Sequence, residues 1–136
     1  MNSDTISILL ADEHEMYREA LALTLGHTSS IQVIGQCGNG PEAERLFGSL
    51  RPDIVLIDIT VQADKGFSTT GRILAEYPEA RIIWLSTFFI DSYSSRLAPS
   101  GARGYMTKSM PYQQMLEVIH TVHGGGLYAG EQAQPE

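Results

Sequence analysis

The sequence predicts an α/β fold in which a five-stranded parallel sheet is covered by helices on both faces. Five short apolar runs alternate along the chain with five segments whose apolar residues recur at helical spacing. The central run Asp53–Ile57 lacks polar alternation, which is typical of a strand buried on both faces of a parallel sheet. Parallel strands need crossover connections, and helices in regular alternation supply them.

Each predicted element rests on its own local pattern of apolar residues and of residues that stop helices. The predicted strands are Ile6–Ala11, Ile31–Gly35, Asp53–Ile57, Arg81–Ser86 and Gly104–Lys108. The predicted helices are Met16–Leu25 before Gly26, Asn39–Leu50 with its proline start, Gly66–Tyr77 before Pro78, Asp91–Ser100, and Pro111–His123 before three glycines. Right-handed crossovers make a flavodoxin-like (βα)5 doubly wound sandwich the predicted topology.

Composition narrows the classes of function. The 136 residues fit one domain with a sizeable core, and the net charge of −7 disfavours direct nucleic-acid binding. The single cysteine, Cys37, excludes an internal disulfide and is expected to be buried. No apolar run reaches the length of a membrane span, and Met1–Asp4 does not resemble a signal peptide. We therefore expect a cytoplasmic location.

Polar side chains follow four of the predicted strands where those strands end. They are Asp12 and Glu13, Asp58, Ser86 and Lys108. In a parallel sheet these residues meet at one edge, where three carboxylates repel one another unless a cation compensates their charge. Carboxylates that converge in this way suit magnesium, and a lysine with a hydroxyl suits an anionic group. A phosphoryl group beside magnesium would satisfy all of these side chains, with one carboxylate as its nucleophile.

In this arrangement the sequence resembles the receiver domains of bacterial two-component response regulators. Residues 11–14, Ala-Asp-Glu-His, resemble the acidic pair of that family, and Asp58 resembles its phosphoacceptor. The segment Gly101–Lys108 is similar to the family's strand that carries a switch aromatic, here Tyr105, and an invariant lysine. The resemblance runs from about Ile6 to Tyr128.

Two further stretches resemble the NarL/FixJ branch of the family. These are Gln36–Ala43 and the closing Val122–Tyr128. In that branch a helix-turn-helix DNA-binding domain follows, so we expect residues 1–128 to be the receiver domain. Residues 129–136 are then expected to be a polar, frayed tail that begins a linker to a DNA-binding domain absent from this chain.

The resemblance implies a role for each residue. Asp58 would accept a phosphoryl group from a sensor histidine kinase, while Asp12, Glu13, Asp58 and the backbone carbonyl of Thr60 would serve Mg²⁺. Lys108 and Ser86 would contact phosphoryl oxygens. Tyr105 would turn inward as Ser86 moves.

The same resemblance implies what kind of protein this is. It implies a phosphorylation-controlled transcriptional switch that forms a homodimer, and a phosphoacceptor rather than an enzyme. Self-catalysed phosphoryl transfer and autodephosphorylation are the only reactions expected.

Two segments depart from the family pattern. Gln62 stands where the loop after Asp58 usually has proline, so we expect the Thr60–Lys65 loop to be more mobile and to weaken Mg²⁺ binding. Phe88–Ile90 is apolar where the family is usually polar, which indicates a contact surface or one phenylalanine tucked into the core. The helix Asp91–Ser100 contains several serines and Pro99, so we expect it to be short, distorted or mobile.

Some readings stay open beside this one. A receiver-like interaction module that does not use phosphorylation is the main alternative. A phosphatase would want an aspartate where Thr60 stands, and a flavin carrier would want a phosphate loop where Asp12 and Glu13 stand, so both are disfavoured. We expect His14 simply to be exposed, with a role near the metal as the alternative.

Overall fold

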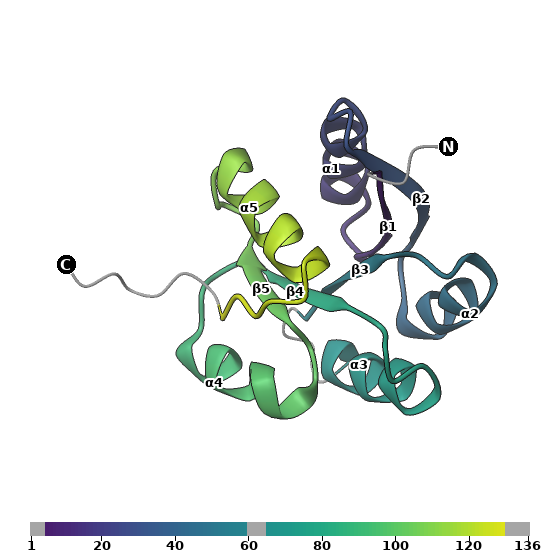
Figure 1. Ribbon diagram of the computed structural model, residues 1–136, viewed down its shortest axis with the longest axis vertical. Coiled ribbons are helices and arrows are strands. Elements are labelled where there is room, and N and C mark those ends of the chain that lie inside the picture. Colours follow the sequence, from purple (N-terminus) through teal and green to yellow (C-terminus); the bar gives the residue numbers. More distant parts are fainter. Residues whose placement is uncertain (1–4, 60–64, 130–136) are drawn as a thin grey trace.

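The computed structural model describes residues 5–59 and 65–129, in which five strands alternate with five helices (Figure 1). The strands are β1 (Ile6–Ala11), β2 (Ile31–Cys37), β3 (Ile54–Asp58), β4 (Ile82–Ser86) and β5 (Gly104–Thr107). The helices are α1 (Glu15–Gly26), α2 (Gly40–Leu50), α3 (Lys65–Glu76), α4 (Asp91–Ser100) and α5 (Tyr112–His123). All strands pair in parallel in the order β2-β1-β3-β4-β5, which confirms the predicted flavodoxin-like topology.

The sheet separates two hydrophobic cores. Helices α1 and α5 cover one face, and α2, α3 and α4 cover the other (Figure 1). Successive residues of a strand point to opposite faces, so Leu56 of β3 packs with the first pair of helices and Val55 and Ile57 pack with the other three. The central strands therefore need apolar residues at every position, which explains their unbroken apolar runs.

The strand boundaries differ slightly from those predicted. β2 continues past Gly35 to Cys37, because Gln36 and Cys37 pair with Leu10 and Ala11 of β1. Cys37 is buried, as predicted, and is a free thiol. Burial raises the pKa of that thiol, which leaves it a poor nucleophile.

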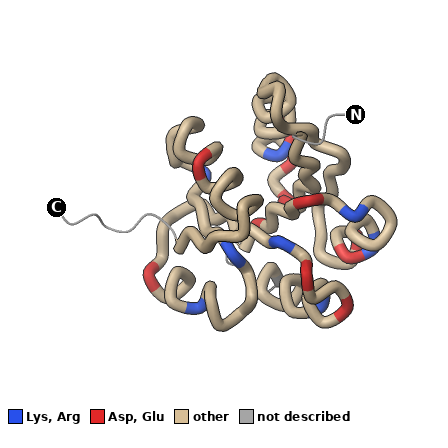
Figure 2. Tube along the Cα trace, in the orientation of Figure 1, with Lys and Arg blue, Asp and Glu red and all other residues tan. Residues whose placement is uncertain are grey.

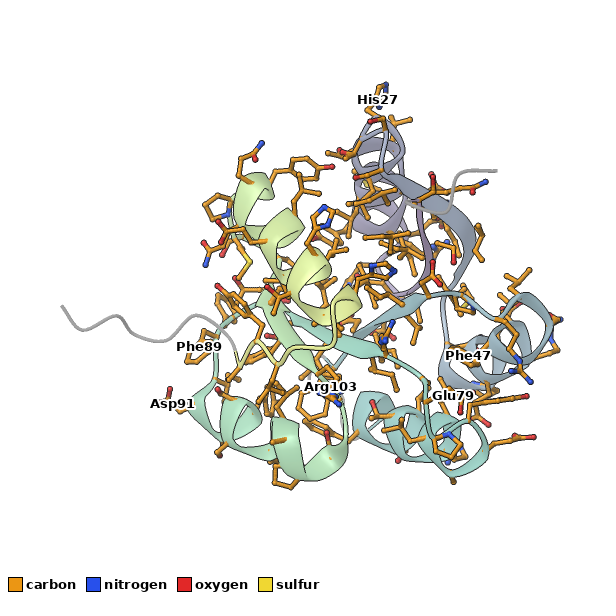
Figure 3. The ribbon with its side chains drawn as sticks, viewed as in Figure 1. His27, Phe47, Glu79, Phe89, Asp91 and Arg103 are labelled. Atoms are coloured by element: carbon orange, nitrogen blue, oxygen red, sulfur yellow. The ribbon has the colours of Figure 1, made fainter. Side chains whose placement is uncertain are left out.

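The start of α2 follows its predicted cap. The side chain of Asn39 accepts a hydrogen bond of 2.9 Å from the backbone N–H of Glu42, and Pro41 stands in the first turn. Phe47, labelled in Figure 3, then anchors the helix in the core. Cap, proline and apolar spacing thus agree on one helix.

Helix α4 forms over its full predicted range despite its composition. Leu97 is completely buried and anchors the helix. Pro99 is the last residue but one, so the hydrogen bond that it cannot donate belongs to the final turn. The helix ends at Ser100, and Gly101, with φ of 93°, is its C-cap. Helical structure is therefore present, while the predicted mobility stays a prediction.

Charged residues are spread over the described part of the molecule (Figure 2). Its basic residues lie on several elements rather than on one. None of the helices in residues 5–59 and 65–129 combines the length and apolarity that a membrane span requires. The predictions for Thr60, for the loop from Thr60 onward and for the tail after Ala129 concern residues outside the described part, apart from Lys65 at the start of α3.

Candidate functional site

Asp58 is the last residue of β3 and lies at the carboxyl edge of the sheet. Its side chain is only 5% exposed. The neighbouring residue Ile59 continues the ladder through a 2.9 Å bond from its N–H to the carbonyl of Leu85. Gly66, near the start of α3, packs against the backbone here, because a Cβ on Gly66 would lie 2.8 Å from the Asp58 carbonyl oxygen. The backbone around Asp58 is therefore fixed on two sides.

Asp12 lies directly after β1, and local hydrogen bonds set its orientation. Its Oδ1 accepts a 2.8 Å bond from the backbone N–H of His14, two residues later, which is the geometry of an Asx turn. The carbonyl of Asp12 accepts a 2.8 Å bond from Nη1 of Arg18 on α1. The Asp12 carboxylate is thereby held at the strand end, with 3% of its side chain exposed.

Lys108 follows β5 and joins the two carboxylates. Its Nζ lies 2.8 Å from Asp12 Oδ2, an ion pair without hydrogen-bond geometry, and 3.5 Å from Asp58 Oδ2. The ammonium also lies 4.6 Å from the centre of the Tyr17 ring, within the range of a cation–π contact. With 11% of its side chain exposed, Lys108 is the principal positive charge within contact distance of both carboxylates among the described residues.

The electrostatics of the site favour a cation. Burial raises the pKa of Asp12 above its ordinary value; its contacts with Lys108 and the His14 N–H lower it, and the nearby Asp58 raises it. One ammonium therefore offsets the cost of two buried carboxylates only in part. An additional positive charge would stabilise both carboxylates in their ionised form.

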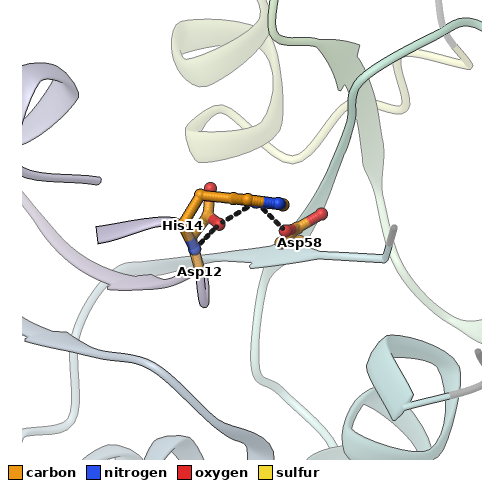
Figure 4. Close-up of side chains that lie close together, drawn as sticks. All are labelled: Asp12, His14 and Asp58. Carbon is orange, nitrogen blue, oxygen red and sulfur yellow. Dashed lines mark hydrogen bonds and ion pairs between the residues drawn. The ribbon is translucent and has the colours of Figure 1, made fainter. Parts of the chain in front are cut away.

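His14 is the third residue of a cluster with Asp12 and Asp58 (Figure 4). Its Nδ1 lies 3.1 Å from Asp12 Oδ1 and 3.3 Å from Asp58 Oδ2, and the three ligand atoms fall within 4.8 Å of one another. The side chain of His14 is 49% exposed, so this group forms the solvent side of the cluster. Glu13 is exposed and is not part of the cluster, although it lines the adjoining cavity of about 450 Å³.

Ser86 and Tyr105 form a second group beside this site. The Ser86 hydroxyl at the end of β4 donates a 2.6 Å bond to the carbonyl of Phe88 and lies 2.9 Å from the Tyr105 hydroxyl. Tyr105 is completely buried, and its hydroxyl accepts a 3.0 Å bond from the backbone N–H of Ile90. Phe89, labelled in Figure 3 near the start of α4, stacks on the Tyr105 ring at 5.4 Å, whereas Phe88 is 74% exposed. One phenylalanine is therefore tucked in and the other is on the surface.

Comparisons with known proteins identify the family that carries this site. Residues 8–120 match the family described as the response regulator receiver domain. The chain belongs to that family.

The proteins similar to this chain are regulators by their names. The receiver is 30% identical over 127 residues to the response regulator GacA of Pseudomonas viridiflava and 28% identical over 128 residues to the transcriptional regulatory protein DegU of Brevibacillus brevis. These alignments cover 93% and 94% of this chain but 59% and 54% of the relatives, so the chain spans little more than half of their length. A crystal structure of a LuxR-family two-component response regulator from Aurantimonas sp. SI85-9A1 is similar with a TM-score of 0.85 and 27% identity, over 91% of this chain and 89% of that one.

The receiver fold brings together most of the predicted site residues. Asp12, Asp58 and Lys108 meet within direct contact, and Ser86 pairs with Tyr105. The metal roles of Glu13 and of the Thr60 carbonyl stay predictions, because Glu13 is not one of the three clustered residues and Thr60 is outside the described residues.

The contact of His14 with both carboxylates was not expected from the sequence. A signal was present, because an Asx turn on Asp12 brings the residue two positions later over its carboxylate. That spacing identifies His14, rather than the adjacent Glu13, as the neighbour of Asp58.

Tyr17 offers a test of the electrostatics of the site. Its buried hydroxyl has no hydrogen-bond partner within the described residues, and burial, with the charges of Asp12 and Asp58, raises its pKa to about 12. Tyr17→Phe is therefore expected to keep or raise the free energy of unfolding at pH 7, by up to about 1 kcal/mol.

The pH dependence of the Tyr17→Phe effect follows from the direction of the pKa shift. Above pH 10 the unfolded phenol loses its proton while the folded one keeps it, so the wild type loses stability between pH 10 and about 12 and the variant avoids that loss. Urea unfolding at pH 7 and pH 11 measures both effects. A variant that is less stable than the wild type at pH 11 would contradict the assignment.

The hydroxyl of Tyr105 offers a second test. It contacts Ser86 Oγ, the N–H of Ile90 and, at 3.2 Å, the carbonyl of Phe88. Tyr105→Phe leaves the Ile90 N–H without its acceptor and is expected to lower the free energy of unfolding by about 1–2 kcal/mol. Amide exchange at Ile90 should accelerate in this variant but not in the control Tyr93→Phe, which keeps all three contacts. Unchanged exchange at Ile90 would argue against this network.

The segment after α5 lies along the edge of β5, beside Tyr105. The N–H of Tyr105 donates a 3.0 Å bond to the carbonyl of Tyr128, and the N–H of Tyr128 donates a 2.9 Å bond to the carbonyl of Arg103. The hydroxyl of Ser94 on α4 bonds to the carbonyl of Ala129. Tyr105 therefore contacts Ser86 through its side chain and the exit segment, residues 127–129, through its backbone.

Proposed function

We propose that this receiver domain accepts a phosphoryl group on Asp58 from the phosphohistidine of a sensor kinase. The observation that carries the proposal is the Asp58 carboxylate beside the Lys108 ammonium, at 3.5 Å, with the buried Asp12 on the other side of that ammonium. In the reaction an Asp58 oxygen attacks phosphorus, the bond from phosphorus to the donor imidazole nitrogen breaks, and that nitrogen keeps the electron pair. Positioning and charge neutralisation supply most of the catalysis in such a transfer.

The charges present determine what else the reaction needs. Asp12, Asp58 and the incoming phosphoryl group carry more negative charge than Lys108 alone offsets. The carboxylates of Asp12 and Asp58 are hard oxygen ligands that fit Mg²⁺, with Glu13 and the Thr60 carbonyl as the further ligands implied by the family. When bound, the ion would neutralise charge on the phosphoryl oxygens. The Lys108 ammonium would form an ion pair with one of those oxygens, as it now does with Asp12 Oδ2.

The response to phosphorylation would pass through Ser86 and Tyr105. A phosphoryl oxygen on Asp58 would compete with Phe88 and Tyr105 for the Ser86 hydroxyl, which now contacts both. Any resulting shift of Tyr105 would act on the exit segment, because the Tyr105 N–H bonds to Tyr128. Tyr105 thus connects Ser86 to the segment at the end of the domain.

The output proposed is transcriptional. The relatives named above include a transcriptional regulatory protein, and the chain covers only part of their length. A structure of RcsB from Salmonella enterica serovar Typhimurium is bound to promoter rprA, and this chain matches 66% of that chain at 15% identity. We infer that residues 1–128 are the receiver, that 129–136 begin a linker to a helix-turn-helix domain, and that the regulator acts as a homodimer in the cytoplasm.

Acetyl phosphate tests the proposed phosphorylation directly. Incubation with Mg²⁺ is expected to add the mass of one phosphoryl group to the wild type and none to Asp58→Asn, which has no carboxylate nucleophile. Asp53→Asn is the matched control and should be phosphorylated, because Asp53 lies at the opposite end of β3 and bonds to Ser7. Equal mass gain in Asp58→Asn would refute the assignment of the acceptor.

One observation favours a second function, a receiver-like interaction module that does not use phosphorylation. Tyr105 is already buried and bonded to Ser86, and the family resemblance associates that inward position with the switched form. Phe88 and Ile90, both exposed, would then offer a permanent contact surface. Absence of phosphoryl uptake by the wild type in the acetyl phosphate experiment would support this function.

A further inference from the structure

Nδ1 of His14 has two close contacts that require opposite protonation states of that nitrogen. Its Nδ1 lies 3.1 Å from Asp12 Oδ1, a contact for which this nitrogen must carry a proton, and 3.0 Å from Lys108 Nζ, a contact for which it must offer a lone pair. One nitrogen cannot do both at once. Among the described residues, three electron-pair donors, from Asp12, His14 and Asp58, therefore converge on a small region that a cation would satisfy (Figure 4).

The separations of His14 Nδ1 from the two carboxylates fit neighbouring ligand positions of an octahedral site. Ligands about 2.1 Å from an ion and at right angles to one another lie about 3.0 Å apart. The His14 Nδ1 is 3.1 Å from Asp12 Oδ1 and 3.3 Å from Asp58 Oδ2, so both separations that involve His14 are close to that value. Glu13 offers no atom to this group.

The two oxygens of the Asp12 carboxylate have different neighbours. Oδ1 faces His14, whereas Oδ2 faces Lys108 at 2.8 Å. The ammonium of Lys108 can therefore keep its ion pair with Oδ2 while Nδ1 of His14 and Oδ1 serve an ion. The contact from Lys108 to His14 must be given up, and Asp58 Oδ2, now 3.5 Å from Lys108 Nζ, is shared between the ammonium and the ion.

We propose that Nδ1 of His14 is a direct ligand of the divalent ion that binds Asp12 and Asp58, and that it shifts the preference of the site toward Mn²⁺. The inference rests on the proposed function, because it concerns the cation of the same phosphoacceptor pocket. Magnesium prefers oxygen ligands, whereas an imidazole ligand favours the later divalent metals, for which affinity generally rises along the first transition row. Replacement of His14 should therefore weaken Mn²⁺ binding more than Mg²⁺ binding.

Pulsed electron paramagnetic resonance of the Mn²⁺-loaded chain tests this proposal without any activity assay. The wild type is expected to show the ¹⁴N coupling of a directly bound imidazole, and His14→Gln is expected to lose it. The matched control His27→Gln should keep the coupling, because His27 caps the far end of α1. Titrations should show a loss of Mn²⁺ affinity of about tenfold or more in His14→Gln, with a smaller loss for Mg²⁺.

The outcomes separate this inference from the proposed function. Mn²⁺ binding without ¹⁴N coupling, or coupling that persists in His14→Gln, overturns the role of His14 and leaves phosphorylation of Asp58 in place. Failure of the wild type to bind either ion overturns the inference together with the metal-dependent function. Because the His14 side chain is about half exposed, His14→Gln should fold, and its circular dichroism and urea unfolding confirm this before the metal experiments.

Discussion

Lys108→Met is expected to slow phosphorylation of Asp58 by acetyl phosphate by about 10²- to 10³-fold, the usual cost of removing one preorganised electrostatic contact. The ammonium is the positive charge that contacts both Asp12 and Asp58, and it is almost completely buried. Its removal leaves two buried carboxylates facing an incoming anion. Single-turnover rates with saturating Mg²⁺, followed by mass spectrometry, measure the effect.

The same variant should lose stability in a way that depends on pH. Lys108 lowers the pKa of Asp12, so without it Asp12 titrates still higher in the folded state. A carboxyl whose folded pKa is raised holds its proton longer than in the unfolded chain, so stability falls as pH rises above its ordinary pKa of 3.8. The deficit of Lys108→Met should therefore be larger at pH 7.5 than at pH 5.

Arg81→Met provides the matched control for this variant. It removes the same charge from an exposed residue just before β4, at the opposite edge of the sheet. Its phosphorylation rate and the pH dependence of its stability should equal those of the wild type. A wild-type rate in Lys108→Met would exclude Lys108 from the transfer.

Gly66→Ala is expected to lower the free energy of unfolding by about 1–3 kcal/mol, although alanine is the better helix former. A Cβ on Gly66 would lie 2.8 Å from the Asp58 carbonyl oxygen and 2.8 Å from the Ile59 Cα. Both are backbone atoms, of Asp58 and of the residue after it, so relief of the clash must move either β3 or the start of α3. Urea unfolding measures the loss, and slower phosphorylation should accompany it.

Gly71→Ala in the same helix should have the opposite sign. Nothing lies within 4 Å of a Cβ at Gly71, which is an exposed interior position of α3. Only helix propensity then acts, and the free energy of unfolding should rise by about 0.5–1 kcal/mol. If both variants were stabilised, the close approach of Gly66 to Asp58 would be wrong.

Periodicity explains why so much of this protein could be predicted from the sequence. Unbroken apolar runs such as Asp53–Ile57 determine which segments are central strands, and right-handed crossovers then leave few topologies. Because the carboxyl ends of parallel strands share one edge, the meeting of Asp12, Asp58 and Lys108 followed from the chain alone. In the structure Lys108 Nζ lies 2.8 Å from Asp12 Oδ2 and 3.5 Å from Asp58 Oδ2, as expected for residues that share one edge.

Helix α4 shows where local sequence was a poor guide. Its serines and Pro99 favour other conformations, yet a regular helix forms because Leu97 is buried beneath it and Tyr93 packs against the second core. Such burial involves strands distant in the sequence. Propensity over ten residues does not contain that information.

The choice between neighbouring side chains was decided only by tertiary structure. The sequence by itself determined the fold and the edge at which Asp12, Asp58 and Lys108 meet, because strand periodicity fixes where each strand ends. It did not determine that His14 rather than Glu13 would face the two carboxylates, or that the exit segment would bond to the backbone of Tyr105. These contacts depend on an Asx turn at Asp12, on Lys108 just after β5 and on the edge of β5, which come together only in the folded chain.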